Sequence, residues 1–500
     1  MNFNPPHIDY AALSPVIALT VAACVVLLSA VSGPLRRSAP TLTLLGLAGT
    51  AGLLIWNWND PRDLVAGALR LDDLAISISL IAILTAAFAV LFSIREPAAE
   101  QAGKGEYHAL LLGSVLGMVL LAQAQNLVTF FVAIETLSIP LYILCATNMA
   151  RERSLESGLK YLIVGSLGSA TLLYGMAFLY GGSGSTDFAG IAAGIDRAGL
   201  LGDPLVLVGI GMVAVGLAFK TSIAPFHQWT PDVYEGAPTP IASFMAVATK
   251  AAAFAVFVRF FDVALAGEAA DWQPALAVLA ATSIVIGNVG ALGQDSLKRL
   301  LGWSGVAQAG YILGGLVVAG EAGVEALVFY LAGYLFMNGA AFAVVVARER
   351  ETACGDDIEA VRGLGSERPL LAWPLTISML ALAGLPATVG FIGKLYLIEA
   401  LVEGDYTWLA VFIAVGTMIS LAYYLRVVAA MWMRPGGETA PGATPAIAGA
   451  SPEADPIDPE AGRRPYLVGP ALLAAAGAVF FGIVPQPLVE FAQHAGESLF

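Results

Sequence analysis

The sequence predicts an all-α polytopic membrane protein, and two observations carry that prediction. Hydrophobic residues make up 58% of the chain and charged residues only 12%, against roughly one quarter charged residues in a soluble domain. Apolar runs recur from the first twenty residues almost to the end. A helix needs about 20 such residues to cross a hydrocarbon core of about 30 Å, and the runs lack the alternation typical of membrane β-barrels.

Hydropathy and helix-breaking residues predict about 14 transmembrane helices. The first follows the polar start "MNFNPPHIDY", which has no basic region or cleavage signal, so we expect a retained helix and not a signal peptide. We expect the twelfth to be one crossing broken at "AGLPATVGFIG". The predicted spans are 11–32, 40–56, 73–94, 108–123, 126–147, 157–180, 204–225, 239–265, 272–293, 296–319, 324–347, 370–402, 407–432 and 466–489.

Lysine and arginine in the connections predict the orientation, because cytoplasmic loops are enriched in both residues. The loops after even-numbered spans hold only Arg62, Arg70 and Arg197. The loops after odd-numbered spans hold Arg36, Arg37, Arg95, Lys104, Arg151, Arg153, Lys298, Arg299, Arg348, Arg350, Arg362, Arg368, Arg434, Arg463 and Arg464. This asymmetry predicts both termini on the outer side and supports a single crossing at 370–402.

Several classes of function are disfavoured. Cys24, Cys145 and Cys354 are far apart and show no C-x-x-C spacing, which argues against iron–sulfur, zinc or disulfide chemistry. The net charge of −14 and the absence of a basic footprint argue against a nucleic-acid partner. The connection 434–465 is rich in Pro, Ala, Gly and acidic residues, which predicts a flexible cytoplasmic loop.

The remaining basic residues lie within the predicted spans: Lys160, Lys220, Lys250, Arg259, Lys394 and Arg426. Lys160, Arg259 and Arg426 are near span ends, where a long side chain can reach the interface, so a purely structural role is equally open for them. Lys250 lies about 16 Å into its span and Glu135 about 12 Å into the fifth, at 1.5 Å per residue. Lys220 and Lys394 are also placed at membrane depth.

Charges at this depth cost about 2.5–3.5 kcal/mol each on insertion scales, so they should face protein or a hydrated path. A lysine there can change charge, because burial favours its neutral form and a nearby carboxylate favours its charged form. Arginine stays charged. These residues therefore favour ion transport, although ion pairs that only fix helix packing are the alternative.

Helix breakers accompany two of the lysines. Pro225 follows Lys220, and Pro386 precedes Lys394. Discontinuous helices near the bilayer midplane are typical of ion sites in transporters, whereas ordinary proline kinks are the simpler alternative. Because the two breaks fall five spans apart, the spacing suggests inverted repeats of five helices. His227, beside the first break, is placed either to relay protons outward or to cap a re-entrant loop.

Three segments resemble a known family: "KTSIAPFHQWTPDVYEGAPTPIASFMAVATKAAAF" (220–254), "ALGQDSLKRLLGWSGVAQAGY" (291–311) and "LAGLPATVGFIGKLYLIEA" (382–400). They are similar to the antiporter-like proton-channel subunits of bacterial respiratory complex I (NADH-quinone oxidoreductase), subunit N in particular, which are related to Mrp cation/proton antiporters. The resemblance extends from about Gly105 to Arg434. The first three helices and the tail match only in hydropathy.

The resemblance implies two inverted five-helix repeats, helices 4–8 and 9–13, with helices 7 and 12 broken. It divides the chain into an N-terminal three-helix segment (1–104), the first repeat (105–265), the second repeat (266–433), the loop 434–465 and a C-terminal helix and tail (466–500). Its proton-path residues correspond to Glu135, paired with Lys220, and to Lys250 and Lys394; we add His227 and Lys160 as candidates. Gln308 stands where relatives often have histidine, so we expect no titratable relay there.

The resemblance further implies a non-redox, proton-translocating membrane subunit of a translocase in the bacterial inner membrane, with periplasmic termini. It implies no cofactor in this chain, since NADH, FMN, iron–sulfur clusters and quinone belong to partner subunits. The implied partners are an antiporter-like M-type subunit, small K- and J-type subunits and the lipid bilayer. An Mrp-type antiporter subunit and a structural spacer are the alternatives.

Overall fold

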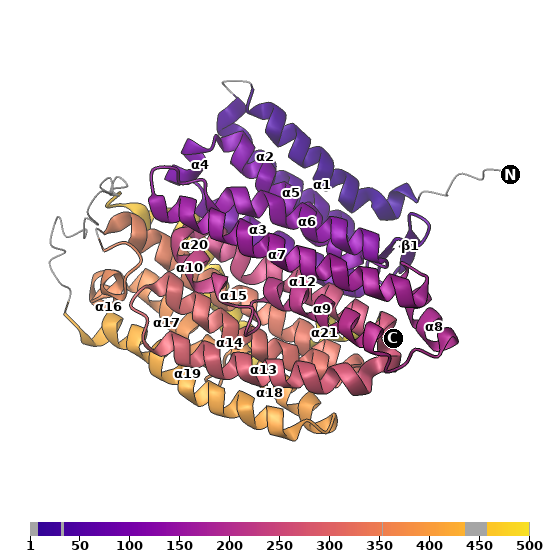
Figure 1. Ribbon diagram of the computed structural model, residues 1–500. Helices are drawn as coiled ribbons and strands as arrows, with labels where there is room; N and C mark the ends of the chain where they lie inside the picture. Colours follow the sequence, from indigo (N-terminus) through magenta and orange to yellow (C-terminus); the bar gives the residue numbers. More distant parts are fainter. Residues whose placement is uncertain (1–8, 32–34, 353, 436–457, 500) are drawn as a thin grey trace.

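Long helices lie side by side along one common direction in the computed structural model (Figure 1). The structure describes residues 9–31, 35–352, 354–435 and 458–499. The C-terminus, α8 and the hairpin strand β1 lie at one end of the bundle, and α4 and α16 lie at the other. The N-terminal helices α1 and α2 cover one side, while α18 and α19 form the opposite side.

The first half of the chain contains α1 (Tyr10–Ser29), α2 (Ala39–Trp56), α3 (Asp73–Phe92), α4 (Pro97–Gln101), α5 (Lys104–Gln123), α6 (Leu127–Cys145), α7 (Glu152–Ser183), α8 (Phe188–Ala198), α9 (Pro204–Thr221), α10 (Trp229–Gly236), α11 (Thr239–Phe244) and α12 (Lys250–Arg259). The π-helical segments η2 (Met245–Thr249) and η3 (Phe260–Ala264) flank α12. A 3₁₀ turn, η1 (Leu35–Ser38), precedes α2.

The second half contains α13 (Ala269–Leu292), α14 (Leu297–Val318), α15 (Glu321–Glu351), α16 (Leu364–Glu367), α17 (Pro369–Ala383), α18 (Val389–Glu403), α19 (Thr407–Met433), α20 (Pro465–Ile483) and α21 (Gln486–Glu497). Its 3₁₀ turns are η4 (Ala266–Glu268), η5 (Ile358–Val361) and η6 (Ala461–Arg463). The predicted loop 434–465 lies largely outside the described residues, at 436–457.

Among the described residues, 13 helical stretches are long and apolar enough to cross a membrane. The chain is therefore a nearly all-helical, multi-pass membrane protein, as the composition predicts. The core runs along Thr239–Ala264, whose most apolar 18 residues are 100% buried, and along α15, where the corresponding share is 94%. In α1 that share is 22%, because α1 lies at the outside of the bundle.

A small antiparallel hairpin interrupts the helical pattern. Strand β1 (Arg62–Leu64) pairs with β2 (Leu69–Leu71), with Arg62 opposite Leu71. The turn uses three residues with positive φ, Val65, Ala66 and Gly67. The prediction from hydropathy did not include this hairpin, which is too short to show an alternating pattern.

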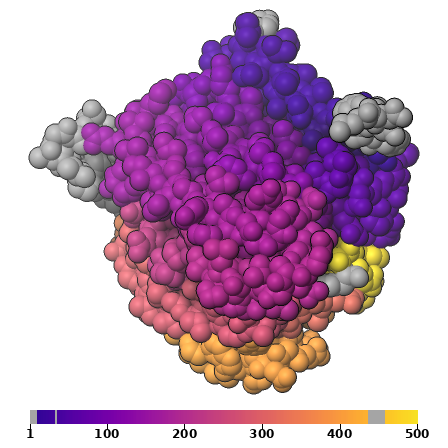
Figure 2. Space-filling model, turned by 45° about the vertical axis from the view of Figure 1, so that its right-hand side comes forward, coloured from indigo at the N-terminus to yellow at the C-terminus, as the bar shows by residue number. Residues whose placement is uncertain are grey.

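The N-terminal and C-terminal segments meet beside this hairpin. Trp58 stacks on Phe491 with ring centroids 5.6 Å apart, and the Leu74 N–H donates to Ser498 Oγ at 3.0 Å. Figure 2 shows the yellow C-terminal segment directly below the indigo N-terminal helices at one edge of the molecule. The C-terminal segment thus packs against residues on both sides of the hairpin in the N-terminal part of the chain.

Several predicted span ends differ from the helix ends in the structure, and two of the differences have a clear physical reason. The span 204–225 ends earlier, because α9 stops at Thr221 and Ser222 takes a left-handed conformation with φ 64. The span 466–489 divides into α20 and the separate helix α21, because Pro485 and Pro487 cannot supply the backbone N–H groups that a continuous helix requires. Buried Leu488 and Ala492 give α21 its own apolar side.

Candidate functional site

Lys220 lies in the last turn of α9 and is 3% exposed. The helix ends there because the Ile223 N–H bonds back to the Ala218 carbonyl, which closes the C-terminus. Lys220 Nζ lies 5.2 Å from the Tyr161 ring centroid and 5.5 Å from that of Tyr142. Within the described part of the chain, this ammonium has no hydrogen-bond partner, so aromatic faces supply its surroundings.

Glu135 accepts a hydrogen bond from Ser169, which joins α6 to α7. The described residues show no direct ion pair between Glu135 and Lys220, and the expected pairing of these two side chains stays a prediction. Tyr142 lies on the same helix as Glu135 and contributes to the aromatic surroundings of Lys220. The carboxylate thus has the Ser169 hydroxyl as its partner, whereas the ammonium lies among aromatic rings.

Lys250 is the first residue of α12, directly after the π-helical segment η2, and is 1% exposed. Its Nζ donates to Tyr234 Oη at 3.1 Å. Gly305 on α14 leaves the space that the ammonium occupies, since a Cβ at that position would lie 3.2 Å from Lys250 Nζ. The lysine therefore extends from the core helix α12 toward both α10 and α14.

Lys394 on α18 is 4% exposed, and its Nζ donates to the Leu382 carbonyl at 3.0 Å. That carbonyl is available because α17 ends at Ala383, and the last carbonyls of a helix lack partners within the helix. Gly384 takes φ +75, and a Cβ there would lie 3.0 Å from Lys394 Nζ. The interruption between α17 and α18 therefore creates both the acceptor and the space for this lysine.

Gln308 on α14 connects Lys394 to further polar groups. Its Nε2 donates to the same Leu382 carbonyl at 3.3 Å, and its Oε1 accepts from the Tyr330 hydroxyl. Nε2 also lies 3.4 Å from Tyr424 Oη, which in turn contacts Ser304 Oγ. Sequence reasoning missed the tyrosines, although the helical spacing of Ser304 and Gln308 in an apolar span was a usable signal.

His227 lies between α9 and α10, with its ring 5.2 Å from that of Trp303. Burial holds the pKa of His227 below its usual range. Its Nδ1 has no hydrogen-bond partner among the described residues, while its carbonyl accepts from the Thr230 N–H at the start of α10. Both roles considered for His227, proton relay and loop capping, stay predictions.

Lys160 does not join the buried lysines. Its side chain is 42% exposed and pairs with Glu156 at 2.7 Å and Asp232 at 2.9 Å. Asp232 also accepts from Arg299 at 2.6 Å, and Glu235 accepts from the same guanidinium at 2.9 Å. We call Lys160, Asp232, Glu235 and Arg299 the α10 ion cluster.

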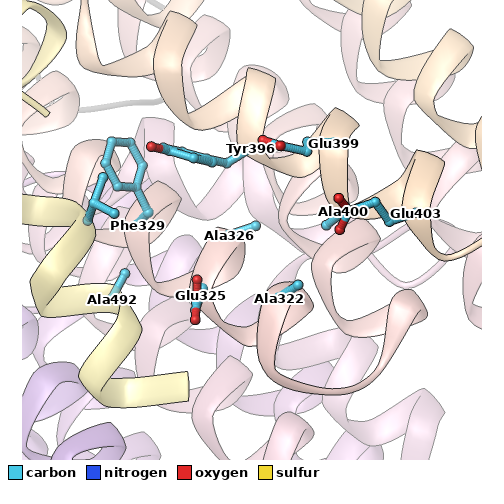
Figure 3. Close-up of a pocket in the computed structure, with 10 residues that line it drawn as sticks. Ala322, Glu325, Ala326, Phe329, Tyr396, Glu399, Ala400, Glu403 and Ala492 are labelled. Carbon is cyan, nitrogen blue, oxygen red and sulfur yellow. The ribbon is translucent and has the colours of Figure 1, made fainter. Parts of the chain in front are cut away.

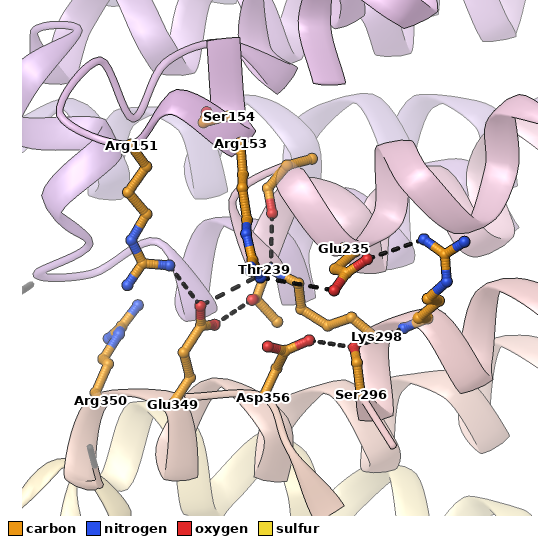
Figure 4. A network of polar contacts seen from close by, with 12 residues as sticks. Arg151, Arg153, Ser154, Glu235, Thr239, Ser296, Lys298, Glu349, Arg350 and Asp356 are labelled. Atoms are coloured by element: carbon orange, nitrogen blue, oxygen red, sulfur yellow. Dashed lines mark hydrogen bonds and ion pairs between the residues drawn. The ribbon is translucent and has the colours of Figure 1, made fainter. Parts of the chain in front are cut away.

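A second polar group lies beside this cluster and is centred on Glu349 of α15 (Figure 4). Glu349 accepts from Arg151 at 2.9 Å and from the Thr239 hydroxyl. Lys298 Nζ lies 3.8 Å from Glu349 and donates to the Ala237 carbonyl at 3.0 Å. Residues from α11, α14 and α15 are thereby joined at one end of the bundle.

An acidic pocket of about 200 Å³ lies among α15, α18 and α21 (Figure 3). Glu325, Glu399, Glu403 and Tyr396 surround it. None of the three buried lysines lines it. This acidic pocket is therefore separate from the buried lysines.

Residues 124–420 match the family described as "NADH:quinone oxidoreductase/Mrp antiporter, TM". Over 485 residues the chain is 37% identical to NADH-quinone oxidoreductase subunit N of Trichlorobacter lovleyi, which covers 97% of this chain and 96% of that relative. The chain belongs to the NADH:quinone oxidoreductase/Mrp antiporter family. The resemblance seen in the sequence is confirmed.

Other members of this family are similar over most of their length. The chain is 40% identical over 439 residues to NAD(P)H-quinone oxidoreductase subunit 2 of Gloeobacter violaceus, covering 87% of this chain and 84% of that one. A chain of respiratory complex I from Thermus thermophilus with bound aureothin is 33% identical, with a TM-score of 0.78 over 97% of this chain and 100% of that one. A chain of the Mrp complex from Dietzia shares the fold, with a TM-score of 0.79 at 24% identity over 98% and 97%.

Proposed function

We propose that this chain is a non-redox, proton-translocating membrane subunit of an NADH:quinone oxidoreductase, corresponding to subunit N. The observation that carries the proposal is the set of three buried lysines, Lys220, Lys250 and Lys394, none of which has a carboxylate partner in the described residues. The groups in direct contact with the lysines are neutral, so no direct ion pair fixes any of them in its charged form. Subunit N relatives at 37% identity support the assignment.

The proposed path runs along these contacts. Trp229 stacks on Tyr161 beside Lys220, and Tyr234 of the same helix accepts from Lys250. Gly305 of α14 faces Lys250, while Ser304 and Gln308 of α14 lead through Tyr424 and the Leu382 carbonyl to Lys394. Helices α10 and α14 therefore connect the lysines in chain order. Glu135 lies at the Lys220 end, where its charge stabilises the protonated lysine.

We also propose the number of crossings, their division into repeats and the orientation of the chain. We count α17 and α18 together as one broken crossing, which with the 13 stretches makes about 14 crossings. Residues 105–265 and 266–433 form two inverted repeats, with breaks after α9 and α17. The segments 1–104 and 466–500 pack around them, and both termini face the periplasm of a bacterial inner membrane. The excess of Lys and Arg in odd-numbered loops supports this orientation.

Energy for translocation comes from partner subunits. NADH, FMN, iron–sulfur clusters and quinone are bound there, and an M-type antiporter-like subunit and small K- and J-type subunits adjoin this chain in the bilayer. The solved relative in respiratory complex I supports assembly into a multisubunit membrane complex.

A subunit of an Mrp-type cation/proton antiporter is the second candidate, because the matched family includes Mrp antiporters and the fold is shared with an Mrp complex. Affinity purification of the full complex separates the two. Co-purified flavin and iron–sulfur signals with NADH oxidation support the first proposal, whereas a membrane assembly without them supports the antiporter.

The proposed path is tested by Lys220→Ala, Lys250→Ala and Lys394→Ala in the assembled complex. Lys104→Ala is the control, since Lys104 pairs with Glu100 at the surface, where such pairs contribute little. We expect each buried-lysine variant to lower quinone-coupled proton uptake into vesicles, while NADH oxidation by an artificial acceptor stays normal. Unchanged proton-to-electron ratios in all three would refute the path.

A further inference from the structure

Helix α10 is eight residues long, and its first residue closes the surroundings of Lys220. The Trp229 ring stacks on Tyr161 at 4.7 Å with an interplanar angle of 18°. Its Nε1–H donates to the Phe219 carbonyl at 3.1 Å, directly before Lys220 in the chain. Any displacement of α10 therefore moves the aromatic wall beside this ammonium.

The same helix supplies the partner of Lys250. Tyr234 is buried, and its hydroxyl accepts from Lys250 Nζ at 3.1 Å while its ring lies 5.4 Å away. Trp229 and Tyr234 are themselves in ring contact at 6.4 Å. One short helix thus determines the contacts of two lysines that lie on α9 and α12.

Ion pairs connect α10 to α7 on one side and to α14 on the other. Asp232 receives Lys160 from α7 and Arg299 from α14, and Glu235 receives the same Arg299. Burial alone would raise the pKa of Asp232, but the hydrogen bonds from Lys160 and Arg299 outweigh it and keep the pKa below the usual range. Asp232 therefore stays ionised at neutral pH and bridges helices from the two proposed repeats.

Helix α10 is closely packed between its neighbours α7 and α14. A Cβ at Gly236 would lie 2.3 Å from the Arg153 carbonyl oxygen, and one at Gly302 of α14 would lie 3.2 Å from Pro231 Cα. The backbones of α7 and α14 thus approach α10 closely. With so little space, a change in the charge pairing shifts the helix as a unit, since packed interiors transmit displacement.

We propose that Asp232 is a positioning residue that, through α10, sets the contacts of Lys220 and Lys250 together. This inference rests on the proposed function. Its pairs with Lys160 and Arg299 hold Trp229 against Tyr161 and Tyr234 against Lys250. Loss of the carboxylate charge loosens both contacts at once, although Asp232 touches neither lysine.

The experiment compares Asp232→Asn with Glu156→Gln in the assembled complex. Glu156 also pairs with Lys160 but does not belong to α10, so it is a matched carboxylate-to-amide control. We expect Asp232→Asn to lower the proton uptake per electron of the complex by the share that this chain carries, and Asp232→Glu to restore most of it. Glu156→Gln should leave the ratio unchanged.

A double variant tests the route through Tyr234. If Asp232 acts by placing Tyr234, then Asp232→Asn combined with Tyr234→Phe lowers the ratio no further than the stronger single variant. If the losses of the two single variants multiply in the double variant, this route is wrong. A normal proton uptake per electron in Asp232→Asn would overturn the inference. Should Asp232→Asn not assemble, Arg299→Lys decides, with a lowered ratio supporting the inference and a normal ratio rejecting it.

The lysine variants keep the two proposals distinguishable. A loss of proton uptake in Lys250→Ala together with a normal Asp232→Asn complex rejects only the positioning role. Normal proton uptake in both rejects the proton path itself.

Discussion

At the residue scale, the three buried lysines share one property: their nearest partners are uncharged. Lys250 has a tyrosine hydroxyl, Lys394 a backbone carbonyl and Lys220 aromatic faces. An ammonium fixed by a buried carboxylate would be locked in its charged form, because neutralising it leaves the carboxylate unpaired. Neutral partners permit both protonation states.

Tyr234→Phe removes the hydroxyl that accepts the hydrogen bond from Lys250. The ring and its packing remain, but Lys250 Nζ loses its hydrogen-bond acceptor, which costs about 1–3 kcal/mol for a buried group. We expect an assembled complex whose proton uptake per electron falls severalfold. Tyr174→Phe is the control, because Tyr174 is 60% exposed. Equal ratios in the two variants would show that the hydroxyl has no role.

Burial of His227 makes the stability of the folded protein depend on pH. Its pKa in the folded protein lies below the ordinary value of 6.5, so the folded state disfavours the protonated ring. Stability is therefore retained above about pH 6.5 and decreases as pH falls through the range below it. Thermal unfolding of the purified complex should show a steeper loss from pH 7.5 to 5.5 than in His227→Gln. Parallel curves would contradict this.

At the element scale, the sequence predicted which segments are helices better than where they end. Hydropathy located α1, α2 and α19 within a few residues. It placed the end of α9 four residues late, because hydropathy does not report the left-handed turn at Ser222 or the hydrogen bond from the Ile223 N–H to the Ala218 carbonyl that closes the helix. The role of α10 was also not predictable, since its eight residues are too few for a periodic pattern to decide.

Arg350 provides a test of how elements are joined. From the end of α15 it donates to the Phe92 carbonyl at 2.5 Å and the Ile94 carbonyl at 3.0 Å, and it pairs with Glu96. Arg350→Ala leaves a buried carboxylate without its partner, a change that costs about 3–5 kcal/mol. We expect a clearly lower unfolding temperature of the purified complex.

The matched control is Arg153→Ala. Arg153 is 56% exposed and reaches Glu235 only at 3.7 Å, so its loss should cost less than about 1 kcal/mol. If both arginine variants unfold at the same temperature, the contacts of Arg350 with the end of α3 and with Glu96 do not stabilise the protein.

At the scale of the whole molecule, the depth of each charge along its predicted span is enough to identify four candidates for the proposed proton path: Glu135, Lys220, Lys250 and Lys394. Their connection was not predictable, because it depends on α14 lying between Lys250 and Lys394. Gln308 illustrates the difference. A side chain that cannot titrate indicates a gap in a proton path, yet Gln308 hydrogen-bonds to Tyr330 and to the Leu382 carbonyl that Lys394 shares.

The proposed path requires Lys250 to change its charge, and Lys250→Arg separates this role from that of a fixed positive charge. Arginine keeps a positive charge at this position but does not deprotonate. The measurement is proton uptake per electron in vesicles containing the assembled complex, with NADH oxidation by an artificial acceptor as the control. We expect a loss of proton uptake as large as in Lys250→Ala. A normal ratio with arginine would contradict it.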